Sequence, residues 1–121
     1  MNFTRAGALS GFLAVLAGAF GAHALRAQLS PEMLQAFETG ARYQMFHALA
    51  LLYVGMAAER EPRAGLRAAG WLFMIGTLLF SGSLYALALS GVRLFGAVTP
   101  LGGACFLIGW LALARATFSR S

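Results

Sequence analysis

The chain has 121 residues, of which 60% are hydrophobic and only 11% are charged. Roughly a quarter of the residues of a soluble domain are charged, so this chain has too little polar surface to cover a water-soluble globule. The net charge of +5 comes from nine arginines, without lysine or aspartate. Because these arginines stand between apolar runs, they indicate membrane topology and not nucleic-acid binding. The single cysteine, Cys105, excludes an intramolecular disulfide.

The first apolar run covers residues 6–25 and has the length of a transmembrane helix, for which about 20 residues are needed. Arg5, this run and the triplet Ala-His-Ala at 22–24 together resemble a signal peptide with a small-residue cleavage site. We expect a retained helix, because the run reaches the length of a span.

A stripe of small residues follows one face of this first helix. Its members are Gly7, Gly11, Ala14, Gly18 and Gly21. Inside lipid, small residues let helix backbones approach closely, and close packing is what holds membrane helices together. The stripe therefore predicts the face on which the first helix packs.

Residues 30–42 follow with a helical pattern of their own. The triplet Ser-Pro-Glu at 30–32 suits a helix start, with serine as N-cap, proline at the first helical position and glutamate in the first turn. Glu38 and Arg42 stand one turn apart, the spacing of a favourable ion pair. We expect an amphipathic helix on the outer surface, bent at Gly40 where it runs into the next span.

The remaining apolar runs predict three more spans. Residues 43–58 form a short run, which we interpret as a span whose first turn lies in the membrane interface; a buried or re-entrant helix is the alternative. Residues 68–90 and 94–114 are longer runs, separated by a tight turn at Gly91 and Arg93.

Four spans place both termini on the same side of the membrane. The six arginines on that side are Arg5, Arg60, Arg63, Arg67, Arg115 and Arg120, and the three on the other are Arg26, Arg42 and Arg93. Because positive charge is retained inside, this bias predicts that both termini are cytoplasmic. The predicted fold, one domain over residues 1–121, is an all-α integral membrane protein with four transmembrane helices in an up-and-down bundle and an outer-surface amphipathic helix between the first and second.

Polar residues within the predicted spans are the candidates for a functional site. An ionisable side chain inside a span is a functional hypothesis by default, and the chain has two histidines. Both are predicted near the outer ends of their helices, at similar depth. The candidate ligand-binding residues are His47, Gln44, Tyr43, Ser81, Tyr85, Thr99 and His23.

Three functions compete with a structural role for these residues. Two histidines could ligate a haem iron, a metal would need Glu38 as a third ligand, and a proton path would need polar groups that the cytoplasmic half lacks. Histidine, tyrosine and glutamine near span ends are also at home in the interface. At about 100° per residue, His23 lies opposite the small-residue stripe, which counts against its meeting His47. We favour the structural role, without metal or cofactor.

An enzyme finds little support in the sequence. There is no Ser-His-acid set, no carboxylate pair within a span and no phosphate-binding loop. The expectation is therefore that the protein is not an enzyme.

Four motifs in order carry a family resemblance: GAFGAHAL at 18–25, YQMFHALALL at 43–52, FSGSLYALALSG at 80–91 and TPLGGACFLIGWLALA at 99–114. Together they resemble the YgdD-like family of small bacterial inner-membrane proteins, the domain-of-unknown-function family four-two-three. The resemblance implies a four-helix protein of the bacterial cytoplasmic (inner) membrane with a retained first helix. It implies no reaction, substrate or cofactor.

The sequence thus favours a non-enzymatic structural or accessory component that packs with itself, as a homo-oligomer, or with a larger membrane complex through its glycine faces. The alternative is a small binding or transport module, whose outer-leaflet pocket holds a lipid, a quinone-like molecule or a metal. The lipid bilayer is the partner that the composition demands.

Overall fold

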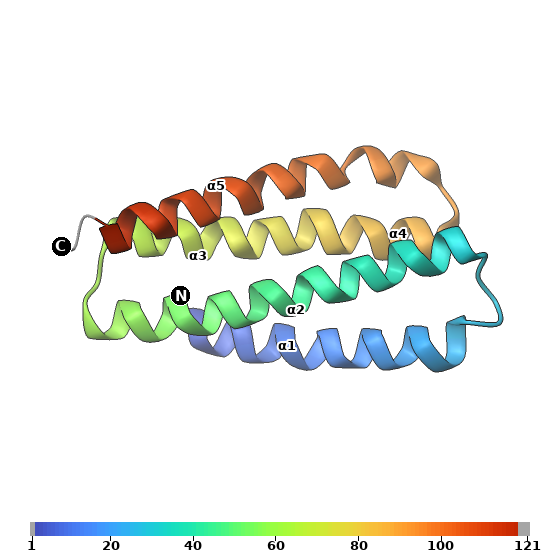
Figure 1. Cartoon of the computed structure of the whole chain (residues 1–121), viewed down its shortest axis with the longest axis horizontal. Coiled ribbons are helices and arrows are strands. Elements are labelled where there is room, and N and C mark those ends of the chain that lie inside the picture. Colours follow the sequence, from blue (N-terminus) through green and yellow to red (C-terminus); the bar gives the residue numbers. More distant parts are fainter. Residues whose placement is uncertain (1, 119–121) are drawn as a thin grey trace.

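Helices that run side by side and alternate in direction make up the computed structural model, which describes residues 2–118 (Figure 1). In chain order they are α1 (Phe3–Phe20) with the π-helical turn η1 (Gly21–Leu25), α2 (Pro31–Arg60), α3 (Ala64–Gly76) with the π-helical turn η2 (Thr77–Ser81) and α4 (Gly82–Ser90), and the 3-10 turn η3 (Arg93–Ala97) with α5 (Thr99–Phe118). The described part of the chain is therefore all-α, as predicted.

Local sequence explains where several of these helices begin and end. The Ser30 hydroxyl oxygen accepts a hydrogen bond from the Met33 N–H at 3.2 Å, with proline at the first helical position, as the sequence predicts. Asn2 caps α1 in the same way and accepts from the Arg5 N–H at 2.9 Å. The α4 helix ends at Gly91, whose φ of 75° is a left-handed conformation that costs glycine little.

Three segments within the described residues are long and apolar enough to cross a bilayer. They are Phe3–Leu25, Ala64–Ser90 and Arg93–Thr117, and they contain the predicted spans 6–25, 68–90 and 94–114. The α2 helix is longer than any of these, but its composition is less apolar. The predicted span 43–58 lies inside α2, so by length and composition the described residues show three spans and not four.

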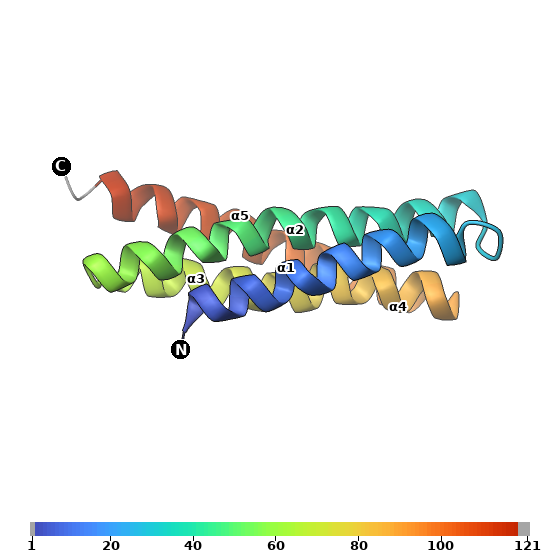
Figure 2. The same ribbon diagram turned by 90° about the horizontal axis from the view of Figure 1, so that it is seen from below.

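The separate amphipathic helix expected at 30–42 is not seen. These residues are the first turns of α2, which continues through Gly40 without a break and keeps its line in both views of the bundle (Figures 1 and 2). Packing is the reason. Phe37 is buried in a cluster with Ala88 of α4, and Gly40 lets the Ser81 carbonyl come within 3.3 Å of where a Cβ would be. Contacts with α4 hold the segment upright along the bundle.

The small-residue stripe of α1 packs on α2, as predicted. A Cβ on Gly7 would lie 2.8 Å from the Ala48 carbonyl oxygen, and one on Gly21 would lie 2.9 Å from the Phe37 ring. Gly18 is the exception, with no atom near enough to contact a Cβ. Because most of the stripe already faces α2, this face of α1 is not free to pack against another chain.

Other glycines bring helix backbones into direct contact inside the bundle. A Cβ on Gly102 of α5 would overlap the backbone nitrogen of Phe80 in η2, and one on Gly55 of α2 would overlap the backbone of Thr4 in α1. The close Gly102 contact lies where the π-helical turn η2 interrupts the regular pattern of its segment. These contacts set the positions of α1 and α5 on the rest of the bundle.

The largest apolar core lies toward the end of the bundle where α1 begins, α5 ends and α2 passes into α3 (Figure 1). Its buried members are Phe3, Ala50, Leu51, Val54, Leu66, Ala69, Phe73, Phe106, Leu113 and Ala116. Residues of α1, α2, α3 and α5 all contribute to this core, which fixes the positions of these four helices relative to one another at this end of the bundle.

Candidate functional site

Gln44 joins three helices through its amide group. Its Nε2 donates to the backbone carbonyl of Ser10 on α1 at 3.0 Å, while its Oε1 accepts a hydrogen bond from the Tyr85 hydroxyl on α4 at 2.6 Å. The side chain is only 6% exposed. Both ends of the amide are therefore engaged, and the bonds fasten α1 and α4 to α2 in an apolar setting where water cannot replace them.

His47 is held between α2 and α5. Its Nδ1 lies 2.7 Å from the Tyr43 carbonyl oxygen, and its Nε2 lies 3.0 Å from the indole nitrogen of Trp110. The ring is 4% exposed and stacks on Phe106 with the ring centroids 3.5 Å apart. A carbonyl only accepts and an indole N–H only donates, so Nδ1 carries the proton, Nε2 accepts, and the imidazole is neutral.

This geometry bears on the haem and metal alternatives. Both ring nitrogens of His47 already have partners, so ligation of a metal would require the loss of the Tyr43 or the Trp110 bond. Within residues 2–118, histidine, cysteine, aspartate and glutamate side chains form no group of three or more that could hold a metal ion. Glu38, the expected third ligand, is exposed on the surface of α2.

The hydroxyl groups of Ser81 in η2 and Ser83 in α4 also form hydrogen bonds to neighbouring helices. Ser81 is 1% exposed and donates to the Gly40 carbonyl at 2.7 Å, which ties η2 to α2. Ser83 donates its one hydroxyl proton to the Phe80 carbonyl, so Thr99 is the donor in the 2.6 Å bond between Thr99 and Ser83. This second bond ties α4 to the start of α5.

His23 takes no part in this network. It lies in η1 with an exposed side chain, and it has no hydrogen-bond partner among the described residues. This agrees with its expected orientation away from the small-residue stripe. The expected similar depth of His23 and His47 is wrong, because α2 begins at Pro31 and places His47 in its middle. Gln44 hydrogen-bonds to Ser10 of α1, and His47 comes three residues after Gln44 on α2, so His47 lies near the level of Ser10. From Ser10 to His23, the first helix rises by about 20 Å along its axis.

A groove beside this network opens on the surface between α2, η2 and α5. It has a volume of about 540 Å³ and is lined by Tyr43, Phe80, Phe106 and Trp110 together with the ring of His47. The Tyr43 side chain is 38% exposed and packs on Phe80 with ring centroids 4.9 Å apart. Of the seven candidate residues, Tyr43 and His47 line the groove. Gln44, Ser81, Tyr85 and Thr99 form hydrogen bonds elsewhere in the bundle, and His23 is exposed on η1.

Sequence reasoning missed three partners: Ser10, Ser83 and Trp110. Trp110 carried a usable signal, because an indole N–H in the middle of an apolar helix needs an acceptor. Ser10 gave a weaker signal, since the shorter of its two contacts with Gln44 is through its backbone carbonyl, at 3.0 Å against 3.3 Å for its hydroxyl oxygen. The candidate residues therefore form separate bonds between helices and not one polar pocket.

Apolar helices joined by hydrogen bonds that their polar side chains form across the bundle define this molecule as a helical membrane protein. The chain belongs to the family described as "Protein of unknown function (DUF423)", whose model matches residues 17–103. The resemblance read from the four motifs is thereby confirmed.

Similar proteins cover almost the whole chain and are named membrane proteins. UPF0382 membrane protein SERP0230 of Staphylococcus epidermidis is 47% identical over 115 residues, which are 95% of this chain and 93% of the relative. UPF0382 membrane protein YwdK of Bacillus subtilis is 44% identical, with 92% and 91% covered, and a UPF0382 membrane protein of Haemophilus influenzae is 49% identical, with 92% and 89% covered. No solved structure matches the chain.

Proposed function

We propose that the protein is a non-enzymatic component of the bacterial cytoplasmic membrane, a bundle of four transmembrane helices that pairs with a second copy of itself through α2. The observation that carries this proposal is a pair of charged side chains, Glu38 and Arg42, exposed on α2 at the level of the middle of its neighbours. The proposal first requires that α2 cross the membrane.

Packing supports α2 as the fourth span. It has 30 residues and hence a length of about 45 Å, and it contacts α1, α3 and α4. A helix packed along two apolar spans has to share their membrane. Its polar residues Gln44 and His47, which make its composition less apolar, are 6% and 4% exposed and bond inside the bundle. Their hydrogen bonds lower the cost of placing them within the bilayer.

Topology reporters test the four spans. We expect reporter fusions after Glu61 and at the C-terminus to report the cytoplasm, and a fusion after Gln28 to report the other side of the membrane. The reason is the positive-inside bias, with Arg60, Arg63 and Arg67 at the α2–α3 turn. Reporters after Gln28 and Glu61 on the same side would show that α2 does not cross, and the proposal would fail.

The depth of Arg42 follows from its neighbours on α2. Two residues before it, Gly40 accepts the Ser81 hydrogen bond at the end of η2, about 6 Å beyond the midpoint of the segment Ala64–Ser90, and the antiparallel α2 runs from there back toward that midpoint. Two residues after it, Gln44 reaches Ser10 of α1. Arg42 thus lies about 16 Å along the helix axis from its start at Pro31, level with the middle of two apolar spans.

Glu38 and Arg42 are both exposed, and neither has an ion-pair or hydrogen-bond partner in the described part of the chain. A charged side chain at the centre of a lipid-facing helix costs about 3 kcal/mol on insertion scales, so such residues usually pair with one another or face protein. Glu38 and Arg42 begin a stripe along one face of α2 that continues toward Arg60. Its next members, Phe46, Leu49 and Tyr53, are apolar and are exposed as well. The stripe therefore has the composition of an interface between membrane helices.

A second copy fits this stripe by charge. Two copies with the same orientation in the membrane, related by a twofold axis, present the same stripe to each other. Glu38 of each copy then lies one helical turn from the level of the partner's Arg42, within the reach of an arginine side chain, and two cross-chain ion pairs form. The apolar part of the stripe closes the rest of the interface.

A charge-reversal experiment tests the pairing. Glu38→Arg and Arg42→Glu, each expressed alone, place like charges across the interface. We expect the association constant of the dimer in a mild detergent to fall about tenfold for each, a change of about 1.4 kcal/mol. Co-expressed with two different affinity tags, the variants restore both ion pairs in the mixed dimer. We expect the mixed dimer to co-purify as efficiently as the two tagged wild-type chains.

Arg26→Glu is the matched control. Arg26 is also an exposed arginine, but it lies in the turn at 26–30 before α2 and does not belong to the α2 stripe. We expect it to leave the dimer fraction unchanged. Failure of the mixed pair to form would contradict the pairing with a second copy. Dimerisation of either single variant at the wild-type level would contradict the pairing as well. It would mean that Glu38 and Arg42 at most bond within one chain, and such a bond does not depend on mixing the two variants.

The groove beside His47 supports a second candidate, a binding module for an apolar molecule. Its aromatic lining over about 540 Å³ suits an acyl chain or a flat ring. The direction of the His47 bonds argues against a metal there, since both nitrogens are in use.

A further inference from the structure

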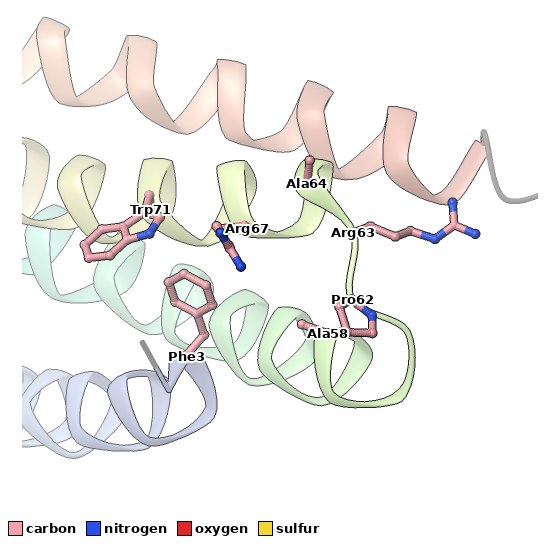
Figure 3. A pocket seen from close by; sticks show the side chains of 7 residues that line it. All are labelled: Phe3, Ala58, Pro62, Arg63, Ala64, Arg67 and Trp71. Carbon is pink, nitrogen blue, oxygen red and sulfur yellow. The ribbon is translucent and has the colours of Figure 1, made fainter.

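A cavity lies where α1 begins and α2 passes into α3, away from the α2 stripe and from the His47 groove. Its volume is about 640 Å³, and Figure 3 shows the side chains that line it. Part of the lining is apolar, from Phe3, Ala58 and Trp71, and the rest carries two arginines, Arg63 and Arg67. The cavity thus combines positive charge with an apolar wall.

The two arginines differ in what they already bind. Arg63 forms an ion pair with Glu61 at 2.6 Å and donates to the Ala116 carbonyl at 3.2 Å, and Figure 3 shows it directed away from the cavity. Arg67 is exposed, has no partner among the described residues, and points toward the Phe3 ring across the opening (Figure 3). Arg67 is therefore the cation that remains available to a ligand.

The aromatic wall places the cavity at the boundary of the hydrocarbon. Trp71 lies one helical turn from Arg67 toward the centre of the apolar segment Ala64–Ser90 and is 44% exposed. Its ring meets the edge of Phe3 with the centroids 5.9 Å apart. Tryptophan is enriched at the level of lipid headgroups, and a cation one turn further out lies at the level of the phosphate.

We infer that this cavity binds the phosphate headgroup of an anionic phospholipid from the leaflet at this end of the bundle. Arg67 holds the phosphate through charge-assisted hydrogen bonds, and the wall of Phe3 and Trp71 contacts the glycerol and the first carbons of the acyl chains. Basic pockets between helices at a membrane surface suit such headgroups. A free phosphate ion would leave the apolar wall unused, which favours a lipid.

Native mass spectrometry of the full chain in mild detergent tests this inference with defined lipids. We expect wild type to retain one phosphatidylglycerol at concentrations at which phosphatidylcholine is lost. Arg67→Gln should weaken retention of phosphatidylglycerol about tenfold, whereas Arg67→Lys, which keeps the charge, should retain most of it. Circular dichroism checks that the variants keep the fold, which the exposed position of Arg67 predicts.

Arg60→Gln is the matched control, since it removes the same charge at the same end of the bundle but does not line the cavity. An equal loss in Arg60→Gln and Arg67→Gln, or equal retention of phosphatidylcholine, would overturn the inference. Displacement of phosphatidylglycerol by inorganic phosphate at equal concentration would show a site for free phosphate and would overturn it as well. Every result is independent of α2 pairing, because the cavity does not include the α2 stripe.

Discussion

Replacing Gly102 by alanine is expected to destabilise the bundle by about 3 kcal/mol, near the upper end of what overpacking costs. A Cβ at this position would overlap the backbone nitrogen of Phe80 and lie 2.7 Å from its Cα. Backbone atoms cannot turn aside as a side chain can, so α5 has to move away from η2. This movement also strains the Thr99–Ser83 bond and the packing of Phe106 against the core. Reversible unfolding in mixed micelles, followed by circular dichroism, measures the loss.

Gly82→Ala is the control, and its expected effect has the opposite sign. Gly82 begins α4, two residues after Phe80, and nothing lies within 4 Å of a Cβ placed there. Alanine restricts the unfolded chain at no steric cost, so the variant should be more stable by about 0.5–1 kcal/mol. Equal gains in stability for Gly82→Ala and Gly102→Ala would mean that helix propensity and not the close α5–η2 contact sets the stability.

His47→Ala is expected to cost about 3 kcal/mol, since it removes a buried ring and leaves the Trp110 indole N–H without an acceptor. The stack on Phe106 is lost at the same time. Unfolding in mixed micelles again gives the free energy. A histidine whose role is to bind a ligand would instead leave the stability of the empty protein nearly unchanged.

The matched control is His23→Ala, the same substitution at an exposed side chain without a partner in the described residues, and it should change stability by less than about 0.5 kcal/mol. Trp110→Phe separates the hydrogen bond from the ring and should cost about 1 kcal/mol, a typical value for a bond between membrane helices. An unchanged stability in His47→Ala would refute the structural role of this histidine.

Much of the fold could be predicted from local patterns. The apolar runs 6–25, 68–90 and 94–114 fall inside helices long enough to span a membrane, because span length depends on composition alone. The helix start at 30–32 and the packing stripe of α1 also followed from residue type and spacing, since caps and close contacts have local steric causes.

The candidate site could be predicted less well. Residues 30–42 carry an amphipathic pattern that suits a membrane surface as well as it suits a helix packed on one side, and only contacts with α4 distinguish the two. The position of those residues sets the register of all of α2. Because they belong to α2, His47 lies in the middle of this helix and not at its outer end. It is therefore far from His23 and within hydrogen-bond distance of Trp110.

Composition and spacing alone established a helical membrane protein, its longest spans, the face on which α1 packs and the residues that needed polar partners. These properties depend on interactions between residues close together in the sequence or on transfer from water to lipid. Both follow directly from the order of residues in the chain. The partners themselves came from the folded bundle. Gln44 bonds across to Ser10 and Tyr85, and His47 to Trp110, through contacts between residues distant in the chain. The exposed Glu38 and Arg42 became informative in the same way, once the neighbours of α2 showed how deep they lie.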